Sequence, residues 1–195
     1  MKGDATMAVS TPKARDGHRV SRALHLTTPR PLTETPAARY VWAIARLALG
    51  WVFVWAFLDK TFGLGHETPA SKAWVDGGSP TAGFLKNSPE GPFAGFYNDL
   101  AGQAWADWLF MIGLAGIGAA LVLGIAMRAA AAAGALLLFM MWTAVLPPEN
   151  NPFMDDHIIY AIVLVGLALV SAGNTLGLGR WWGETALVRR FPVLK

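Results

Sequence analysis

Cysteine is absent from the 195 residues, and charged residues make up 15% of the chain. Without thiols the chain can form no disulfide, thiolate metal site, iron–sulfur cluster or c-type haem attachment. A soluble domain carries about 25% charged residues, because a surface in contact with water needs ionised groups. The shortage of charge therefore argues against a soluble domain.

Histidine is also scarce, and the positions of the four histidines restrict the cofactors further. They are His18, His25, His66 and His157, and none lies deep inside a long apolar run, as an axial ligand of an intramembrane haem would. A copper or di-iron site would need more His or Glu within helices, and the chain has no Gly-rich dinucleotide loop. We expect no haem, flavin or metal here, and quinone remains as the electron carrier that such a chain could hold.

Four long apolar runs determine the fold class. Each is close to the roughly 20 helical residues that cross a bilayer core of about 30 Å, and none has a polar face at a 3.6-residue period. The runs are Tyr40–Leu58, Trp108–Met127, Ala129–Leu146 and Ile158–Gly179. The last turn of the fourth run, which contains Gly173, Asn174, Gly177 and Gly179, is expected to lie already at the surface. The four runs predict an all-α integral membrane protein, a four-transmembrane-helix bundle running up-down-up-down, with a long outer loop between helices 1 and 2.

The second and third runs are separated by a single charged residue, Arg128. A continuous helix over both runs would be about 58 Å long, nearly twice the thickness of the hydrocarbon core. The chain is therefore expected to turn back near Arg128.

The distribution of Lys and Arg predicts the orientation. Residues 1–40 hold seven basic residues, and the C-terminal segment from Arg180 holds four. Residues 59–107 hold three against six acidic residues, and residues 147–157 hold none against three acidic residues. Because cytoplasmic segments carry the excess of Lys and Arg, both termini are predicted to be cytoplasmic in a multi-pass protein of the plasma membrane.

The same counts divide the chain into three parts. Residues 1–39 are predicted to be a flexible basic cytoplasmic tail, residues 40–182 a four-helix membrane domain, and residues 183–195 a cytoplasmic C-terminal tail. Basic segments beside an anionic leaflet account for the pI of about 9.4. We therefore expect the lipid bilayer as a partner, and no nucleic acid.

Polar side chains gather at the predicted outer ends of the helices. Helix one ends with Asp59 and Lys60, and helix four opens with Asp156 and His157. Tyr160 follows Asp156 by four residues, so both side chains can face one cavity. Carboxylates at a helix N-terminus are also ordinary partners of the helix dipole, and that interpretation stays open for each one taken singly. Taken together, the set is a candidate quinone site in which Asp156 or His157 handles the proton.

Two basic residues lie at membrane depth, where charge is expensive. Arg46, two turns inside helix one, either extends to the inner headgroups or takes part in an ion pair or in binding a quinone head. Lys60 is expected to pair with Asp107, Asp155 or Asp156, because a carboxylate on another helix would lower the cost of a lysine near hydrocarbon. The alternative is that its ammonium group reaches water.

The connection between helices one and two is long for a helix bundle. It contains two short apolar stretches bounded by Gly and Pro, PTAGFL and GPFAGFY. Their aromatic side chains indicate an anchor along the outer membrane surface, with a lid over a site as the alternative. Most tryptophans, Trp51 and Trp55 among them, are interpreted as interfacial anchors.

Small residues recur every four positions on the second helix, at Gly116, Ala120 and Gly124. Small residues let helix backbones approach closely in lipid. Because the third helix also begins with several alanines, this stripe predicts that helices two and three form the tightest pair.

Particular segments are similar to a known family. The first helix, RLALGWVFVWAFLDKTFG, has an Arg, a Gly four residues later, an aromatic-rich run and a terminal Lys, here Arg46, Gly50 and Lys60. The block GSPTAGFL…GPFAGFYNDLAG…DWLFMIGL and the run MMWTAVLPPENNPFMDDHIIYAIVLVGLALVSAGNTLGLGRWW follow it. Over about residues 40–195 the chain resembles the actinobacterial and archaeal branch of the DoxX/DoxD family.

The resemblance implies a four-helix subunit of a thiosulfate:quinone oxidoreductase, with menaquinone or ubiquinone as electron acceptor. The outer connections hold nine acidic residues against three lysines and His157, which disfavours binding of the thiosulfate dianion. We therefore expect that a small redox partner subunit performs the sulfur chemistry while this chain handles quinone. The alternative is a non-catalytic accessory subunit that anchors a respiratory or other membrane complex, and a homo-oligomer is also compatible with the sequence.

Overall fold

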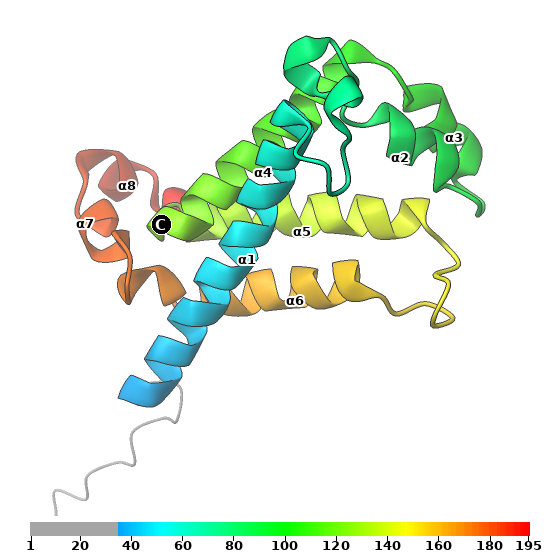
Figure 1. Cartoon of the computed structure of the whole chain (residues 1–195). Helices are drawn as coiled ribbons and strands as arrows, with labels where there is room; N and C mark the ends of the chain where they lie inside the picture. Colours follow the sequence, from blue (N-terminus) through cyan, green and yellow to red (C-terminus); the bar gives the residue numbers. More distant parts are fainter. Residues whose placement is uncertain (1–34) are drawn as a thin grey trace, which may run out of the picture.

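The computed structural model describes residues 35–195, which form helices and no strand (Figure 1). Three helices are long and apolar enough to cross a membrane: α1 (Pro36–Phe62), α4 (Ala104–Leu123) and α5 (Met127–Ala144). This confirms the prediction of an all-helical chain that has helices long and apolar enough to span a membrane. Of the basic tail predicted over residues 1–39, residues 1–34 lie outside the described range, and residues 36–39 belong to α1.

The ends of the long helices follow local sequence signals. Thr35 caps α1, its hydroxyl oxygen accepting from the Ala38 amide at 3.3 Å, and Pro36 occupies the first turn. Glycines with positive φ end two helices, Gly63 (φ 60°) after α1 and Gly124 (φ 72°) after α4. The chain then turns back within three residues into α5, as the length of the combined apolar run required.

The fourth apolar helix, α6 (Asp156–Leu169), has 14 residues and is shorter than the predicted run of Ile158–Gly179. At about 1.5 Å per residue it is about 21 Å long, less than the hydrocarbon thickness. Ser171 takes a left-handed conformation (φ 52°), and the chain continues into a short 3-10 turn, η4 (Ala172–Asn174). The sequence beyond Leu169 has no charged residue up to Gly179, but it is polar and rich in glycine, and the helix therefore ends before the predicted run does.

The four apolar helices associate as two pairs, α1 with α4 and α5 with α6, while α4 and α5 share a smaller contact and α1 barely touches α6. The prediction that α4 and α5 form the tightest pair is therefore wrong. A Cβ added at Gly116, on the predicted stripe, would meet no atom within 4 Å, whereas one added at Gly118, which faces α1, would lie 2.8 Å from Val54 Cγ2. Gly50 of α1 fits similarly closely against the backbone of Val122. Small residues do enable the closest approach, but on the other face of α4.

The two pairs converge at the end where α4 turns into α5 and diverge toward the opposite end (Figure 1). We call these the inner end and the outer end. One apolar core joins both pairs and includes Leu49, Phe53, Met111, Leu121 and Leu164. Because α1 and α6 contribute few mutual contacts, this core leaves the outer ends of the two pairs apart.

The long connection between α1 and α4 folds into short helices at the outer end. They are η2 (Ala70–Lys72), η3 (Trp74–Asp76), α2 (Ala82–Asn87) and α3 (Ala94–Leu100). The buried Tyr97 attaches α3 to α5, because its hydroxyl donates to the Met140 carbonyl at 2.9 Å and lies 2.5 Å from Thr143 Oγ1. Phe93 and Phe96 remain exposed on this segment.

The last residues also fold against the bundle. They form α7 (Gly179–Gly183), α8 (Ala186–Arg190) and η5 (Pro192–Leu194). The Arg128 amide at the start of α5 donates to the Lys195 carbonyl at 3.0 Å, and Trp182 Nε1 donates to the Leu194 carbonyl at 2.6 Å. Residues 179–195 therefore form a cap on the inner end of α5.

Candidate functional site

A groove runs along the outer half of α1, with a volume of about 470 Å³. Its walls come from one helix face and one loop residue: Trp51, Val52, Trp55, Ala56, Asp59, Lys60 and Glu67. The α1 residues repeat at intervals of four, so they stack along one side of the helix. The groove is apolar along most of its length and polar at its outer end.

Two tryptophans form the apolar wall of the groove. The rings of Trp51 and Trp55 lie 6.0 Å apart, and Trp55 meets the His66 ring edge-on at 5.0 Å. The sequence interpretation treated these tryptophans as interfacial anchors. Their spacing of four residues from each other, and of four from Trp55 to Asp59, was the signal that would have placed them in one site.

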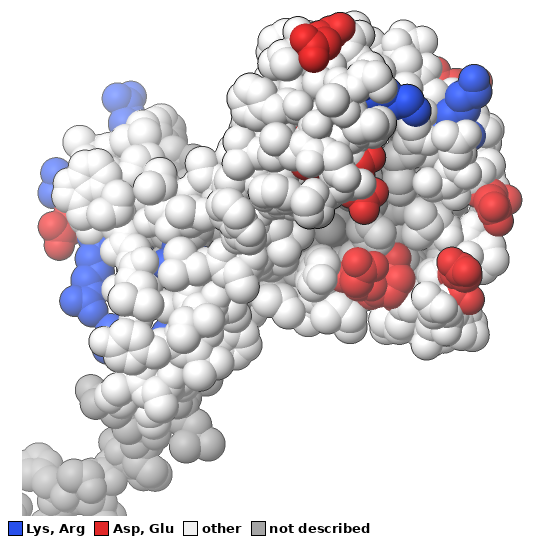
Figure 2. Space-filling model, in the orientation of Figure 1, with Lys and Arg blue, Asp and Glu red and all other residues white. Residues whose placement is uncertain are grey.

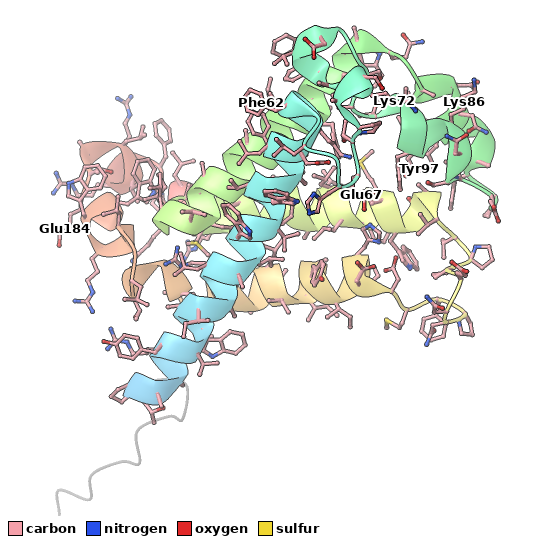
Figure 3. All side chains as sticks on the ribbon, viewed as in Figure 1. Phe62, Glu67, Lys72, Lys86, Tyr97 and Glu184 are labelled. Carbon is pink, nitrogen blue, oxygen red and sulfur yellow. The ribbon has the colours of Figure 1, made fainter. Side chains whose placement is uncertain are left out.

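Asp59 builds the outer end of the groove. Its side chain is 1% exposed and accepts three backbone amides, from His66 at 3.2 Å, Glu67 at 3.1 Å and Thr68 at 2.8 Å. Three amide donors fix the position of this carboxylate against the loop. Asp59 therefore positions the loop that carries Glu67 rather than presenting a free carboxylate; Figure 3 shows Glu67 on this loop beside α1.

Lys60 is half-buried and lines the groove next to Asp59. Within residues 35–195 the ion pairs are those of His157 alone, so the predicted pairing of Lys60 with Asp107, Asp155 or Asp156 is wrong. Asp107 instead accepts the Thr81 hydroxyl at 2.6 Å and the Thr81 amide at 3.0 Å. The prediction failed because local donors occupy that carboxylate, which leaves the Lys60 ammonium group to the groove.

A second polar cluster lies at the N-terminus of α6. His157 Nδ1 is 2.6 Å from Asp155 Oδ2 and 3.6 Å from Asp156 Oδ1, and Asp155 Oδ1 accepts the Ile158 amide at 3.2 Å. The three side chains have the donor types of a metal site, with atoms within 4.8 Å of one another. Both oxygens of Asp155 are already engaged, so the arrangement is that of a capped helix with an orienting His–Asp hydrogen bond.

The structure does not bring Tyr160 into a cavity with Asp156. Tyr160 packs against the apolar core, whereas the side chain of Asp156 is 68% exposed. The α1 groove is lined by neither residue. Of the predicted site residues, Asp59 and Lys60 thus lie together in the groove, and Asp156 and His157 lie together on α6.

Arg46 lies near the inner end, away from both clusters, and is completely buried. Its guanidinium group donates to the carbonyls of Leu121 and Val122 at the end of α4, and to those of Thr175 (3.3 Å) and Leu176 (2.7 Å) after α6. Of the alternatives for Arg46, extension to the inner headgroups does not occur, its guanidinium group makes no ion pair within residues 35–195, and it does not line the α1 groove. The carbonyls at a helix C-terminus are unpaired and carry the negative end of the helix dipole, so they stabilise this cation. We call this arrangement the Arg46 clamp.

Comparison with known proteins identifies no relative: no family model, no curated protein and no solved structure matches this chain.

Proposed function

We propose that this chain is a multi-pass membrane subunit of a quinone-linked oxidoreductase, similar in kind to the DoxX/DoxD proteins that its sequence resembles. A partner subunit would supply the redox centre and oxidise the electron donor. The observation that carries this proposal is the α1 groove, which joins an apolar aromatic wall to an unpaired lysine at the outer end of a membrane-length helix. Sites for small apolar ligands combine these two elements.

The residues of the groove fit a quinone head. A bound quinone would supply two-electron redox chemistry coupled to two protons. Trp51 and Trp55 would hold its ring by their faces, and the Lys60 ammonium group would orient it by donating a hydrogen bond to a carbonyl oxygen. The open side of the groove lets an isoprenoid chain lie along α1 in the lipid.

We assign proton handling to His157 and Asp156. The hydrogen bond between Asp155 and Nδ1 of His157 leaves the imidazole Nε2 for proton exchange with water. Asp156 is exposed and close to the same ring. Both residues belong to the outer end, where the groove also opens, so protons would be exchanged on the outer side.

The proposed topology has four crossings, with both termini on the cytoplasmic side of the plasma membrane. Cations gather at the α7–α8 end and acidic side chains predominate on the visible face of the outer end (Figure 2). This separation agrees with the excess of Lys and Arg expected of cytoplasmic segments. The short α6 would need the turn after Leu169 to complete its crossing.

A non-catalytic accessory or anchoring subunit is the second candidate. Its support is that Arg46, Asp59 and Asp107, which are polar groups of the apolar bundle, all bond to backbone or hydroxyl groups of the chain itself. Such groups serve the fold rather than a reaction. Co-purified respiratory subunits without quinone would favour this candidate.

Quinone binding can be tested on the purified full chain in a mild detergent. We expect lipid extraction followed by mass spectrometry to recover close to one menaquinone or ubiquinone per chain. Titration with decylubiquinone should quench tryptophan fluorescence, with an affinity lowered about tenfold in Trp55→Leu, since stacking contributes about 1 kcal/mol or more.

The matched control is Trp181→Leu, which removes an exposed tryptophan from the inner end. It should leave the decylubiquinone affinity unchanged. Loss of endogenous quinone from Lys60→Met, with normal thermal stability, would support the assigned hydrogen bond. If neither extracted quinone nor saturable quenching is found, the proposal fails.

A further inference from the structure

The cap formed by residues 179–195 presents a basic surface whose cations carry no ion pair. Arg180, Arg189, Arg190 and Lys195 are exposed, and none of their side chains makes a hydrogen bond or ion pair with residues 35–195. Glu184 is the one acidic residue in this segment. Figure 2 shows Lys and Arg side chains at the end of the molecule that carries α7 and α8, and Figure 3 places Glu184 at the same end.

Large apolar side chains alternate with these cations and are also exposed. Trp181 is 62% exposed and Val193 68% exposed, and Leu187 and Phe191 are each about half exposed. Water-facing surfaces do not favour such a mixture, whereas the boundary between headgroups and acyl chains does. Tryptophan and phenylalanine enter the boundary while arginine and lysine remain at phosphate level.

The cap is held at a defined depth by the bundle. Within the cap, Trp182 Nε1 donates to the Leu194 carbonyl. At its boundary with the bundle, the Arg128 amide donates to the Lys195 carbonyl and Arg128 Nη1 donates to the Pro192 carbonyl at 3.4 Å. These contacts lie at the first turn of α5, a helix long enough to cross a membrane. A segment fixed to the start of a spanning helix lies at the membrane surface.

We propose that the cap is a docking surface for the anionic phospholipids of the leaflet at the inner end. Four unpaired cations beside one carboxylate are complementary to phosphatidylglycerol or a similar lipid, and the exposed apolar side chains are complementary to its acyl region. Docking ties the inner end of α5 and the residues after α6 to that leaflet. The inference rests on the membrane topology and not on quinone binding, so the two proposals can fail independently.

The test uses the purified full chain in dodecylmaltoside and measures the Tm during titration with palmitoyl-oleoyl phosphatidylglycerol. The Tm should rise with this lipid and not with the corresponding phosphatidylcholine. The double variant Arg189→Gln with Arg190→Gln should need a concentration of phosphatidylglycerol that is higher by roughly tenfold or more to reach the same rise in Tm. The reason is that each cation near an anionic surface contributes to binding.

Lys72→Gln with Lys86→Gln is the matched control, since it removes two exposed lysines from the outer end (Figure 3). The control should titrate like the wild-type chain. Glycerol 3-phosphate, a more highly charged phosphate ester without acyl chains, should leave the Tm unchanged. An equal rise with phosphatidylcholine or glycerol 3-phosphate, or an equal shift in the control variant, would overturn the proposal.

A second readout needs no variant. At about 1 M salt the Debye length falls to about 3 Å, so the rise in wild-type Tm produced by phosphatidylglycerol should largely disappear. A rise that is independent of salt would show that the cations do not carry the binding, and would contradict the proposal.

Discussion

The inner and outer ends of this bundle use buried charge in opposite ways. At the inner end, one cation on α1 donates to carbonyls of α4 and of the segment after α6, so the Arg46 clamp joins both helix pairs. At the outer end, Asp59 and Asp107 accept donors from the connection between α1 and α4, so each carboxylate acts within a single pair. A buried charge therefore joins the two pairs at the inner end, whereas the buried carboxylates at the outer end do not join them.

The difference shows how a helix bundle with few charges can be closed at one end only. Carbonyls at helix C-termini lack partners within the helix, so one guanidinium group can satisfy several of them. A carboxylate has acceptor atoms alone and therefore organises loop amides. Tyr97, which bonds α3 to α5, is a link between the pairs at the outer end.

The largest effect is expected from removing the clamp. Arg46→Met should lower the free energy of unfolding by about 3 kcal/mol or more, because carbonyls at the end of α4 and in the segment after α6 lose their donor. Arg46→Lys should be intermediate, since one ammonium group cannot span both sets of carbonyls. Denaturation by increasing SDS in mixed micelles measures the free energy of unfolding. If Arg46→Met is as stable as the wild-type chain, the Arg46 clamp does not stabilise the bundle.

Within the first pair, the close approach of α1 and α4 depends on Gly118. Gly118→Leu should destabilise the chain by about 1–3 kcal/mol, because its Cβ would meet Val54 at 2.8 Å. Gly116→Leu, two residues away on an open face, should have little effect in the same denaturation experiment. Similar losses in both variants would indicate that the helix faces are assigned incorrectly.

The outer carboxylates should show a smaller and local effect. Asp59→Asn replaces one acceptor oxygen with an amino group, and we expect a loss of about 1–2 kcal/mol. Hydrogen exchange should accelerate at the amides of His66, Glu67 and Thr68 while α5 and α6 keep their protection. Accelerated exchange throughout α5 and α6 would mean that Asp59 has the global role assigned to Arg46.

The smallest effect is expected at the link between the pairs on the outer side. Tyr97→Phe should cost about 1 kcal/mol, because the hydroxyl loses its bonds to Met140 and Thr143. Limited proteolysis should cleave the chain between α2 and α3 faster, while cleavage within α1 stays as slow as in the wild-type chain. If the rate of proteolysis is unchanged, apolar packing alone attaches α3 to α5.

The sequence predicted the elements better than their partners. The lengths of the apolar runs located the ends of α1, α4 and α5 to within four residues and required the turn near Arg128. The fourth run, even without the Gly-rich turn expected at the surface, extended past Leu169, where α6 ends, because absence of charge does not mark the end of a helix.

Side-chain partners could not be predicted for a related reason. Arg46 was identified as an unusual intramembrane cation, yet it bonds to backbone carbonyls, which every residue possesses and no sequence pattern marks. Lys60 was paired with Asp107, Asp155 or Asp156, yet local donors occupy the first two carboxylates, and Asp156 lies exposed beside His157. Likewise, the glycine stripe was placed on the wrong face of α4, since the face toward α1 is determined by the packing of the whole bundle.

The most direct test of a bundle closed at one end is a pair of distance measurements by pulsed electron resonance. The chain lacks cysteine, so spin labels can be placed at will. Labels at Val41 and Leu169 report on the inner end, where Trp42 lies beside Gly166, and labels at Phe62 and Ile159 report on the outer end; all four sites are exposed.

We predict a short, narrow distance distribution for the inner pair of labels and a longer, broader one for the outer pair. Arg46→Met should broaden the inner distribution. An outer distribution as short and narrow as the inner one, or an inner distribution unaffected by Arg46→Met, would contradict this prediction.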